Sequence, residues 1–383
     1  MQETSKSDAE EQTRMLRESA ADFVKRSTDM AALRKRRGTL PGYDKKQLRQ
    51  MAEMGWFGIL VPEAYGGLGL GFAEMAVVQE ELGKGLMGDP LVPSVLAARV
   101  LHHSSNETLK ERLLPGLADA SALPCVAWQE NLGGLNAAAI ETRARTTQGG
   151  VVISGRKRFV AGAADASGYI VSALSDEGLA LYWVDAAAPG VSLAFEWRAD
   201  ETPSGVLNLT DVAVTSADML TPAGAQALAA IERAIEEAAV IASSEMLGVM
   251  QGSLQMALGY MRTRVQFGKA IGSFQALQHK ASDLYVQQEL ARAVLDDAVH
   301  ELDNSTAARL EQSKLASRCK SRSSDAGLRV TREVIQLHGA IGYTDEYDAG
   351  LYLKRALVLS AWLGNCSAHR RRFAELTKGV VTV

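Results

Sequence analysis

One carboxylate stands alone in an apolar stretch of the sequence, at Glu245 within IASSEMLGVMQGSLQMALGYM. Apolar residues recur there at helical spacing, at Leu247, Met250, Leu254, Ala257 and Met261, and a second small or apolar stripe holds Ile241, Val249 and Gly252 beside Glu245. A carboxylate on a buried stripe must be paired, or burial raises its pKa and makes it a better general base. Two interpretations therefore stand: a core Glu bonded to a backbone group or an Arg, and a catalytic acid.

Two glycine-broken segments, RVQFGKAIGSFQ and QLHGAIGYTDEY, contain the other residues suited to ligand chemistry. In the first, Arg264 offers a charge suited to a phosphate and Phe267 an aromatic face. In the second, Gly339 and Gly342 allow a ligand to approach the backbone. Each segment alone is also compatible with an ordinary helix end.

Composition and missing motifs exclude several function classes. The chain has 383 residues, of which 47% are hydrophobic, with a net charge of −4. These values predict a large core and no nucleic-acid footprint. There is no GxGxxG after a strand, and there is no GxxxxGK[ST], HExxH or GxSxG. No metal site is expected, since the three cysteines lie far apart and His102-His103 resembles a solvated pair. The first twenty residues are polar and charged, and the sequence has no long apolar run. Both features predict a cytoplasmic protein.

Periodicity divides the chain into three regions, and the fold class predicted is α+β, mainly α. Residues 1–120 form an N-terminal helical domain, 121–222 a middle antiparallel β-domain, and 223–383 a C-terminal helical bundle. The expected strands are VVISGRKRFV, GYIVSAL, LALYWVD and VLNLTDVAV. The last two helices are expected at about 308–338 and 347–376.

The sequence resembles the acyl-CoA dehydrogenases over essentially its whole length. Five blocks in order carry the resemblance: MAEMGWFGILVPEAYGGLGLG, EELGKGL, SGRKRFVAGAADASGYIVSA, GYMRTRVQFGKAIGSFQALQHKASD and VIQLHGAIGYTDEYDAGLYLKRA. The resemblance implies the same three regions, with a four-helix bundle at the C-terminus.

The resemblance also implies FAD as the cofactor. It places Arg264 at the FAD pyrophosphate, with Gln266, Phe267 and Gln275 along the same cofactor. Gln336, Gly339 and Ala340 would close over the FAD of a neighbouring subunit. The β-domain edge that meets the flavin would include Gln129, Glu130, Phe159 and Ala161. Relatives usually have Thr or Ser where Gln129 and Ala161 stand, so this edge departs from the family pattern.

The larger departure concerns the catalytic base. Common relatives place a Glu before a Gly where this chain has Leu363-Gly364, and a second family position for the Glu aligns with Ala238. Seven residues separate Ala238 from Glu245, which at about 100° per residue returns to nearly the same helix face. Glu245 is therefore the expected base, with Glu237 as a lesser candidate and no base in this chain as a third option.

The expected function is FAD-dependent α,β-dehydrogenation of an acyl-CoA with a bulky or unusual acyl chain, steroid-derived for example, in lipid metabolism. Electrons would pass to an electron-transfer flavoprotein, and the assembly would be a homotetramer or an α2β2 heterotetramer. Two alternatives stay open: a partner subunit of an α2β2 enzyme with an incomplete or shared site, and a flavin oxidase or monooxygenase on the same fold.

Overall fold

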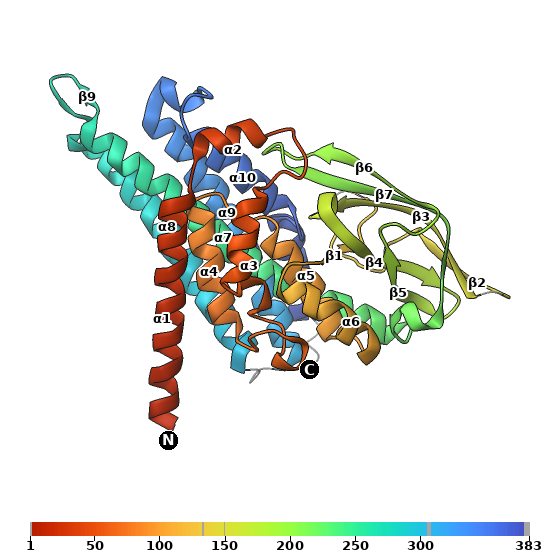
Figure 1. The fold of residues 1–383 in the computed structure, drawn as a ribbon. Coiled ribbons are helices and arrows are strands. Elements are labelled where there is room, and N and C mark those ends of the chain that lie inside the picture. Colours follow the sequence, from red (N-terminus) through yellow and green to blue (C-terminus); the bar gives the residue numbers. More distant parts are fainter. Residues whose placement is uncertain (1, 132–133, 149, 305–307, 379–383) are drawn as a thin grey trace. The chain divides into compact units, whose positions relative to one another are not determined.

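A computed structural model describes residues 2–131, 134–148, 150–304 and 308–378 (Figure 1). Internal contacts divide the chain into two compact units. The helical unit comprises residues 1–33, 72–88 and 239–383, and the β-containing unit comprises residues 34–71 and 89–238.

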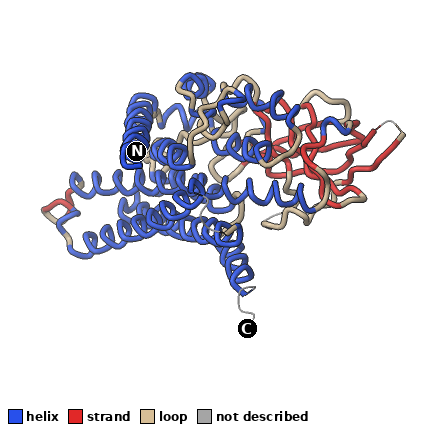
Figure 2. Tube along the Cα trace, turned by 90° about the horizontal axis from the view of Figure 1, so that it is seen from below, coloured by secondary structure: helices blue, strands red, loops and turns tan. Residues whose placement is uncertain are grey.

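The helical unit is built from long helices, drawn in blue in Figure 2. Its helices are α1 (Gln2–Ser27), α4 (Phe72–Lys84), the later part of α7 (Ala225–Thr263), α8 (Gln275–Asn304), α9 (Arg309–His338), α10 (Ala349–Ala361) and α11 (Cys366–Lys378). The short hairpin of β9 (Val265–Gln266) and β10 (Lys269–Ala270) follows α7, η5 (Ile271–Ser273) precedes α8, and η6 (Gly339–Tyr343) follows α9. The short α2 (Met30–Arg36) continues from this unit into the other. The apolar stripes predicted for α7 are buried, which confirms it as a core helix.

Glycines allow α4 and α7 to cross at backbone contact. A Cβ at Gly248 of α7 would lie 1.9 Å from the carbonyl oxygen of Glu80, and a Cβ at Gly83 of α4 would lie 2.3 Å from the carbonyl oxygen of Glu245. These separations are shorter than any van der Waals contact, so only glycine fits at either position. The crossing fixes the backbone of α7 at Glu245.

We expect Gly248→Ala to lower the free energy of unfolding by about 1–3 kcal/mol, because the methyl group would force the two helices apart. Gly259 of the same helix is the matched control, since a Cβ there meets nothing within 4 Å. Gly259→Ala should stabilise the protein by about 0.4–1 kcal/mol through helix propensity. Urea unfolding of both variants checks the prediction, and equal effects would contradict it.

The β-containing unit combines one sheet with short helices. Its helices are α3 (Lys45–Glu53), η1 (Trp56–Gly58), η2 (Glu63–Tyr65), α5 (Leu91–His102), α6 (Glu107–Ala118), η3 (Ala163–Asp165) and η4 (Ser216–Asp218). Its strands are β1 (Leu123–Ala127), β2 (Arg143–Thr147), β3 (Gly150–Val160), β4 (Ala166–Ser175), β5 (Gly178–Asp185), β6 (Val191–Trp197), β7 (Pro203–Val214) and β8 (Met219–Thr221). Side-chain caps begin two of the helices: Asp44 accepts from the N–H groups of Lys46 and Gln47, and Asn106 accepts from that of Leu109. The strand order is β6-β7-β3-β2-β4-β5-β8, with β1 paired to β4.

The fold class predicted from the sequence is confirmed, with two corrections. The four expected strands appear as β3, β4, β5 and β7, but β1 and β2 pair with β4 in parallel, so the sheet is mixed rather than antiparallel. The expected helix at 347–376 is two helices, because Leu363 and Gly364 both have positive φ (57° and 94°) and end the helical path. Across the described ranges, every helix is too short or too polar to span a bilayer.

Candidate functional site

The carboxylate of Glu245 lies in the interior of the helical unit, where the residue is 0% exposed. Nε of Arg355 on α10 donates to its Oε1 at 2.6 Å, and Nε2 of Gln79 on α4 donates to its Oε2 at 2.9 Å. Two helices thus supply the cation and the amide that a buried carboxylate requires. This is the arrangement expected for a core Glu bonded to an Arg.

The surroundings of Glu245 leave little room on its remaining side. A Cβ at Gly88 would lie 2.3 Å from Cδ of Glu245, so the backbone after α4 runs directly against the carboxylate. Both carboxylate oxygens already accept a hydrogen bond within the unit. The assignment of Glu245 as the catalytic base stays a prediction.

The lesser candidate, Glu237, belongs to an ion-pair cluster of the β-containing unit. Its Oε2 accepts from Nε of Arg99 at 2.7 Å and contacts Nε2 of His103 at 2.8 Å, while Nε of Arg233 donates to Oε1 at 3.2 Å. Burial alone would raise the pKa of Glu237, but the His103 hydrogen bond and the Arg99 charge outweigh it and lower the pKa to about 2. A carboxylate with so low a pKa is a weak proton acceptor near pH 7.

The histidine pair next to this cluster differs in part from the sequence-based expectation. His102 is exposed, as expected for a solvated side chain, but His103 is half-buried and contacts Glu237. The reason is that α5 directs these consecutive side chains about 100° apart, so only one of them faces α7.

Leu363, which the resemblance aligns with the usual catalytic Glu, is 0% exposed in the turn between α10 and α11. Two buried basic side chains hold this turn through backbone carbonyls. Nζ of Lys320 donates to the oxygen of Leu359 at 2.6 Å, and Nε2 of His369 donates to the oxygen of Leu363 at 2.8 Å. The turn is therefore a packed structural element around a buried apolar side chain.

Lys320 makes the stability of the helical unit depend on pH. Burial lowers the pKa of Lys320 to about 7, whereas the unfolded chain keeps the ordinary value near 10.5. Between these two values the unfolded state binds a proton that the folded state does not. The free energy of unfolding therefore falls as pH drops through this window, and the loss is complete below about pH 7.

We expect Lys320→Met to remove this dependence. Urea unfolding at about pH 6.5, 8 and 9.5 should show the wild type losing more stability than the variant as pH falls. The lost hydrogen bond to Leu359 shifts the variant by a constant amount, so the difference in slope is the measured quantity. Parallel pH profiles for the two proteins would contradict the prediction.

The segment after α7 forms an exposed hairpin, labelled β9 in Figure 1, that projects past the ends of α7 and α8. Gln266 pairs with Lys269, and the two turn residues Phe267 and Gly268 have φ of 54° and 79°. Two central residues with positive φ define a type I′ turn, which a Gly at the second position favours. This geometry leaves the Phe267 side chain 91% exposed at the tip.

Two hydrogen bonds hold the backbone of Arg264, and its side chain is exposed. Its N–H donates to the carbonyl of Tyr260 at 2.8 Å, and its carbonyl accepts from the N–H of Ile271 at 2.8 Å. Its side chain is exposed and makes no hydrogen bond or ion pair with any described residue. An exposed guanidinium without a partner among the described residues, in the same segment as exposed Gln266, Phe267 and Gln275, is compatible with binding of a pyrophosphate and an aromatic ring system.

The second glycine-broken segment lies at the C-terminal end of α9. Gln336 and Ala340 are exposed, and Gly339 adopts φ 66° and ψ −143°, a conformation reserved for glycine. This chain therefore leaves Gln336 and Ala340 exposed, and their role toward a neighbouring subunit stays a prediction.

In the β-containing unit, Gln129 and the end of β3 lie side by side. The carbonyl of Gln129 accepts from the N–H of Arg158 at 2.8 Å. The next residue, Phe159, has φ 59° and is half-buried, with the Arg158 guanidinium 4.8 Å from its ring centroid, and Ala161 is 8% exposed. Gln129 and Phe159 are thus close to one another at the end of β3, whereas Ala161 is buried, and their role at a flavin stays a prediction.

Glu130, the fourth residue of the predicted flavin edge, holds the loop before β2. Its Oε1 accepts from Nζ of Lys157 at 2.7 Å and from Oγ1 of Thr142 at 2.6 Å. Burial would raise the pKa of Glu130, but the Lys157 and Thr142 hydrogen bonds lower it overall. Burial in turn lowers the pKa of Lys157 to about 8. The Glu130 carboxylate therefore forms its hydrogen bonds within the β-containing unit, to Lys157 and Thr142.

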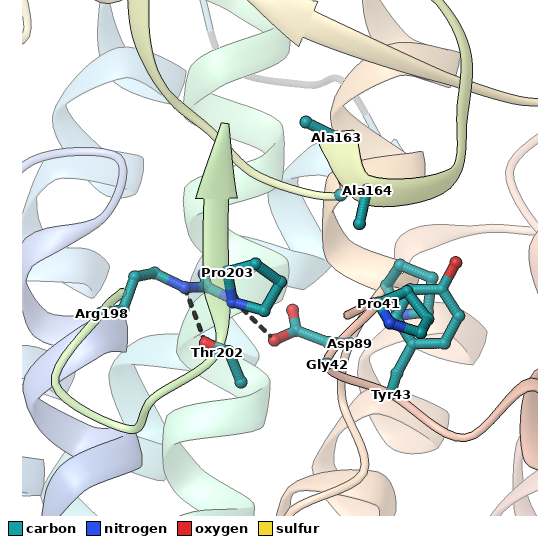
Figure 3. A pocket seen from close by; sticks show the side chains of 11 residues that line it. Pro41, Gly42, Tyr43, Asp89, Ala163, Ala164, Arg198, Thr202 and Pro203 are labelled. Atoms are coloured by element: carbon teal, nitrogen blue, oxygen red, sulfur yellow. Dashed lines mark hydrogen bonds and ion pairs between the residues drawn. The ribbon is translucent and has the colours of Figure 1, made fainter. Parts of the chain in front are cut away.

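A small pocket opens beside this edge (Figure 3). Nη2 of Arg198 donates to Oδ2 of Asp89 at 2.9 Å, and its Nε donates to Oγ1 of Thr202 at 2.8 Å. Ala163 and Ala164 of η3 lie across from them, with Tyr43 at the side. The charged groups in the pocket pair with each other, so they serve the packing of this unit.

Sequence patterns did not single out Arg355 and Gln79, although they suggested an Arg as a possible partner for Glu245. The signal was indirect: an acid on a buried stripe requires a cation or an amide. The residues near Glu245 in the sequence do not show which side chain is its partner, because Arg355 lies 110 residues further along the chain.

A helical unit centred on α7, a β-containing unit with a mixed sheet, and exposed glycine-broken segments at helix ends define the architecture of an acyl-CoA dehydrogenase. Family models for the acyl-CoA dehydrogenase N-terminal, middle and C-terminal domains match residues 10–121, 125–212 and 223–376. The chain belongs to the acyl-CoA dehydrogenase family and is an enzyme of that class.

Individual relatives agree with this assignment. The acyl-CoA dehydrogenase IpdE2 of Mycobacterium tuberculosis is 31% identical over 90% of this chain and 91% of its own length. The acryloyl-CoA reductase (NADH) of Anaerotignum propionicum is 26% identical over 86% of this chain and 85% of its own. Among solved structures, a variant of the Tcur3481-Tcur3483 steroid ACAD superposes with a TM-score of 0.87 at 30% identity, covering 98% of this chain and 100% of the other.

Proposed function

We propose that this chain takes part in FAD-dependent α,β-dehydrogenation of a bulky or unusual acyl-CoA thioester in lipid metabolism. The assembly would be a homotetramer or an α2β2 heterotetramer in the cytoplasm that passes electrons to an electron-transfer flavoprotein. The observation that carries the proposal is the exposed Arg264–Gln275 segment within this family fold. The steroid ACAD at 30% identity supports the bulky substrate.

In this proposal the residues of the hairpin and its surroundings bind and orient the cofactor. Arg264 holds the pyrophosphate by charge-assisted hydrogen bonds, and Phe267, Gln266 and Gln275 cover the same cofactor. Gln129, Phe159 and Ala161 line the flavin edge, while Gln336, Gly339 and Ala340 serve the cofactor of a neighbouring subunit. When bound, FAD would accept the hydride that leaves the β-carbon of the acyl chain.

Glu245 enters the proposal as the candidate proton acceptor for the α-carbon. A catalytic base must reach the proton that it removes, directly or through one water. On taking the proton, Glu245 would lose its negative charge beside the Arg355 guanidinium, whose Nε donates to it at 2.6 Å. Proton abstraction by this carboxylate would therefore weaken the buried charge-assisted contact with Arg355.

A second candidate function follows from those contacts: a subunit of an α2β2 enzyme in which the other chain supplies the base. The observations that favour it are the use of both Glu245 oxygens inside the helical unit and the buried Leu363 at the usual acid position. The paired name of the Tcur3481-Tcur3483 steroid ACAD also supports it.

Expression of the chain alone, followed by its absorbance spectrum and an anaerobic titration with acyl-CoA thioesters, separates the candidates. A yellow protein that bleaches on titration supports a self-sufficient dehydrogenase. A yellow protein that bleaches only after a partner chain is added supports the two-chain enzyme. Bleaching by none of the thioesters, with or without a partner, would contradict both.

A further inference from the structure

Three aromatic rings of the helical unit meet at the C-terminal end of α9. The ring centroid of His338 lies 4.8 Å from that of Tyr260 on α7 and 4.7 Å from that of Tyr347, which follows η6. The two tyrosine rings are 6.0 Å apart, and His338 is 3% exposed. These separations are those of packed aromatic pairs. We call Tyr260, His338 and Tyr347 the aromatic cluster.

Packing rather than charge holds the His338 ring. Its Nδ1–H donates to the carbonyl of Val334, one helical turn earlier, at 2.7 Å. Its Nε2 is buried without a hydrogen-bond partner among the described residues. Burial lowers the pKa of His338, with a partial offset from the Val334 bond, so the ring is neutral near pH 7.

One side of the aromatic cluster leads to the hairpin segment. The ring of Tyr260 packs on His338, while its carbonyl accepts the N–H of Arg264 at 2.8 Å. The carbonyl of Arg264 in turn accepts the N–H of Ile271 across the base of the hairpin at 2.8 Å. The position of the Tyr260 backbone therefore determines where the hairpin begins.

The other side of the cluster leads to the turn after α9. His338 is followed directly by Gly339, and a Cβ at Gly342 would lie 3.0 Å from Cβ of His338 and 2.7 Å from the carbonyl oxygen of Ile335. The turn Gly339–Tyr343 thus folds back onto His338 and onto the last turn of α9.

We propose that the aromatic cluster couples the Gly339–Tyr343 turn to the Arg264–Gln275 segment, so that the two cofactor-contacting segments of one chain keep a fixed arrangement. His338 is the positioning residue at its centre. The inference rests on the proposed function for the cofactor roles of the two segments. In an assembly, the segment that contacts a chain's own FAD and the turn that contacts a neighbour's FAD would then be ordered together.

Hydrogen exchange of the purified full chain tests the coupling without any turnover. We expect His338→Ala to accelerate amide exchange by about tenfold in both segments. This factor corresponds to the free energy that a packed aromatic pair contributes. His338→Phe, which keeps a ring in place, is the matched control and should exchange nearly as the wild type does. Tyr347→Ala, at a half-buried position, repeats the test if His338→Ala fails to fold.

Faster exchange in both segments, restored by His338→Phe, supports the coupling. Faster exchange confined to the Gly339–Tyr343 turn, or no change in either segment, overturns it. The FAD dissociation constant gives a second readout, which should also rise about tenfold in His338→Ala. A wild-type chain that binds no FAD would refute the proposed function, yet the exchange result would still decide the coupling.

Discussion

Replacing Glu245 by glutamine is expected to lower the free energy of unfolding by about 1.5–3 kcal/mol, because Arg355 would lose a charge-assisted hydrogen bond to a buried carboxylate. Arg355 donates to Glu245 at 2.6 Å, and the two side chains are 8% and 0% exposed. Because both side chains are withdrawn from water, salt screens this contact much less than it would a surface ion pair. Urea unfolding measures the loss, and a change below about 1 kcal/mol would show that water or another group compensates Arg355.

Arg355→Met is the matched variant that separates structure from catalysis. It breaks the same ion pair but leaves the Glu245 carboxylate in place. If Glu245 is the base, acyl-CoA bleaching should fall by about 10²–10⁴-fold in Glu245→Gln and persist in folded Arg355→Met. If Glu245 has only a structural role, both variants should bleach at the wild-type rate at temperatures where they are folded. The double variant completes the cycle that isolates the pair energy.

Arg264→Ala is expected to weaken FAD binding by about 10- to 100-fold, so that the protein is purified with little flavin. The backbone of Arg264 is held by two hydrogen bonds and its side chain has no partner among the described residues, so the substitution removes no described contact and a loss of flavin would report the proposed cofactor contact. Hydrogen bonds to a charged group contribute about 1.5–3 kcal/mol, which converts to that range. Flavin absorbance per chain and a titration of the apo-protein with FAD measure the change.

Arg262→Ala is the control for Arg264→Ala, because it removes an exposed positive charge two residues away on the last turn of α7. A general electrostatic effect of the basic segment would weaken FAD binding equally in both variants. A specific pyrophosphate contact affects Arg264→Ala alone. Unchanged flavin content in Arg264→Ala would refute the role of this residue.

Local periodicity was sufficient to predict the long helices and the middle strands. The apolar stripes around Glu245 predicted α7, and β-branched runs predicted β3, β4, β5 and β7. The break between α10 and α11 was missed, although Gly364 is a helix-stop signal, because Leu363 before it carries no signal for its own positive φ. The parallel pairing of β1 with β4 was also invisible, since strand partners are set by long-range packing.

The candidate site shows the same division between local and long-range information. Gly268 directly follows Phe267 and favours a tight turn, and that turn exposes the Phe267 side chain. The partners of Glu245 come from α4 and α10, which only the tertiary fold brings to α7. A lone acid on an apolar stripe therefore indicates that a partner or a function exists without deciding between them.

The most direct test of the proposed function is an anaerobic titration of the purified flavin-containing protein with acyl-CoA thioesters, alone and together with a partner chain, followed by flavin absorbance. We predict a yellow protein whose flavin bleaches with a bulky acyl-CoA in at least one of the two preparations. A flavin that stays oxidised with every thioester in both preparations would contradict a role in acyl-CoA dehydrogenation.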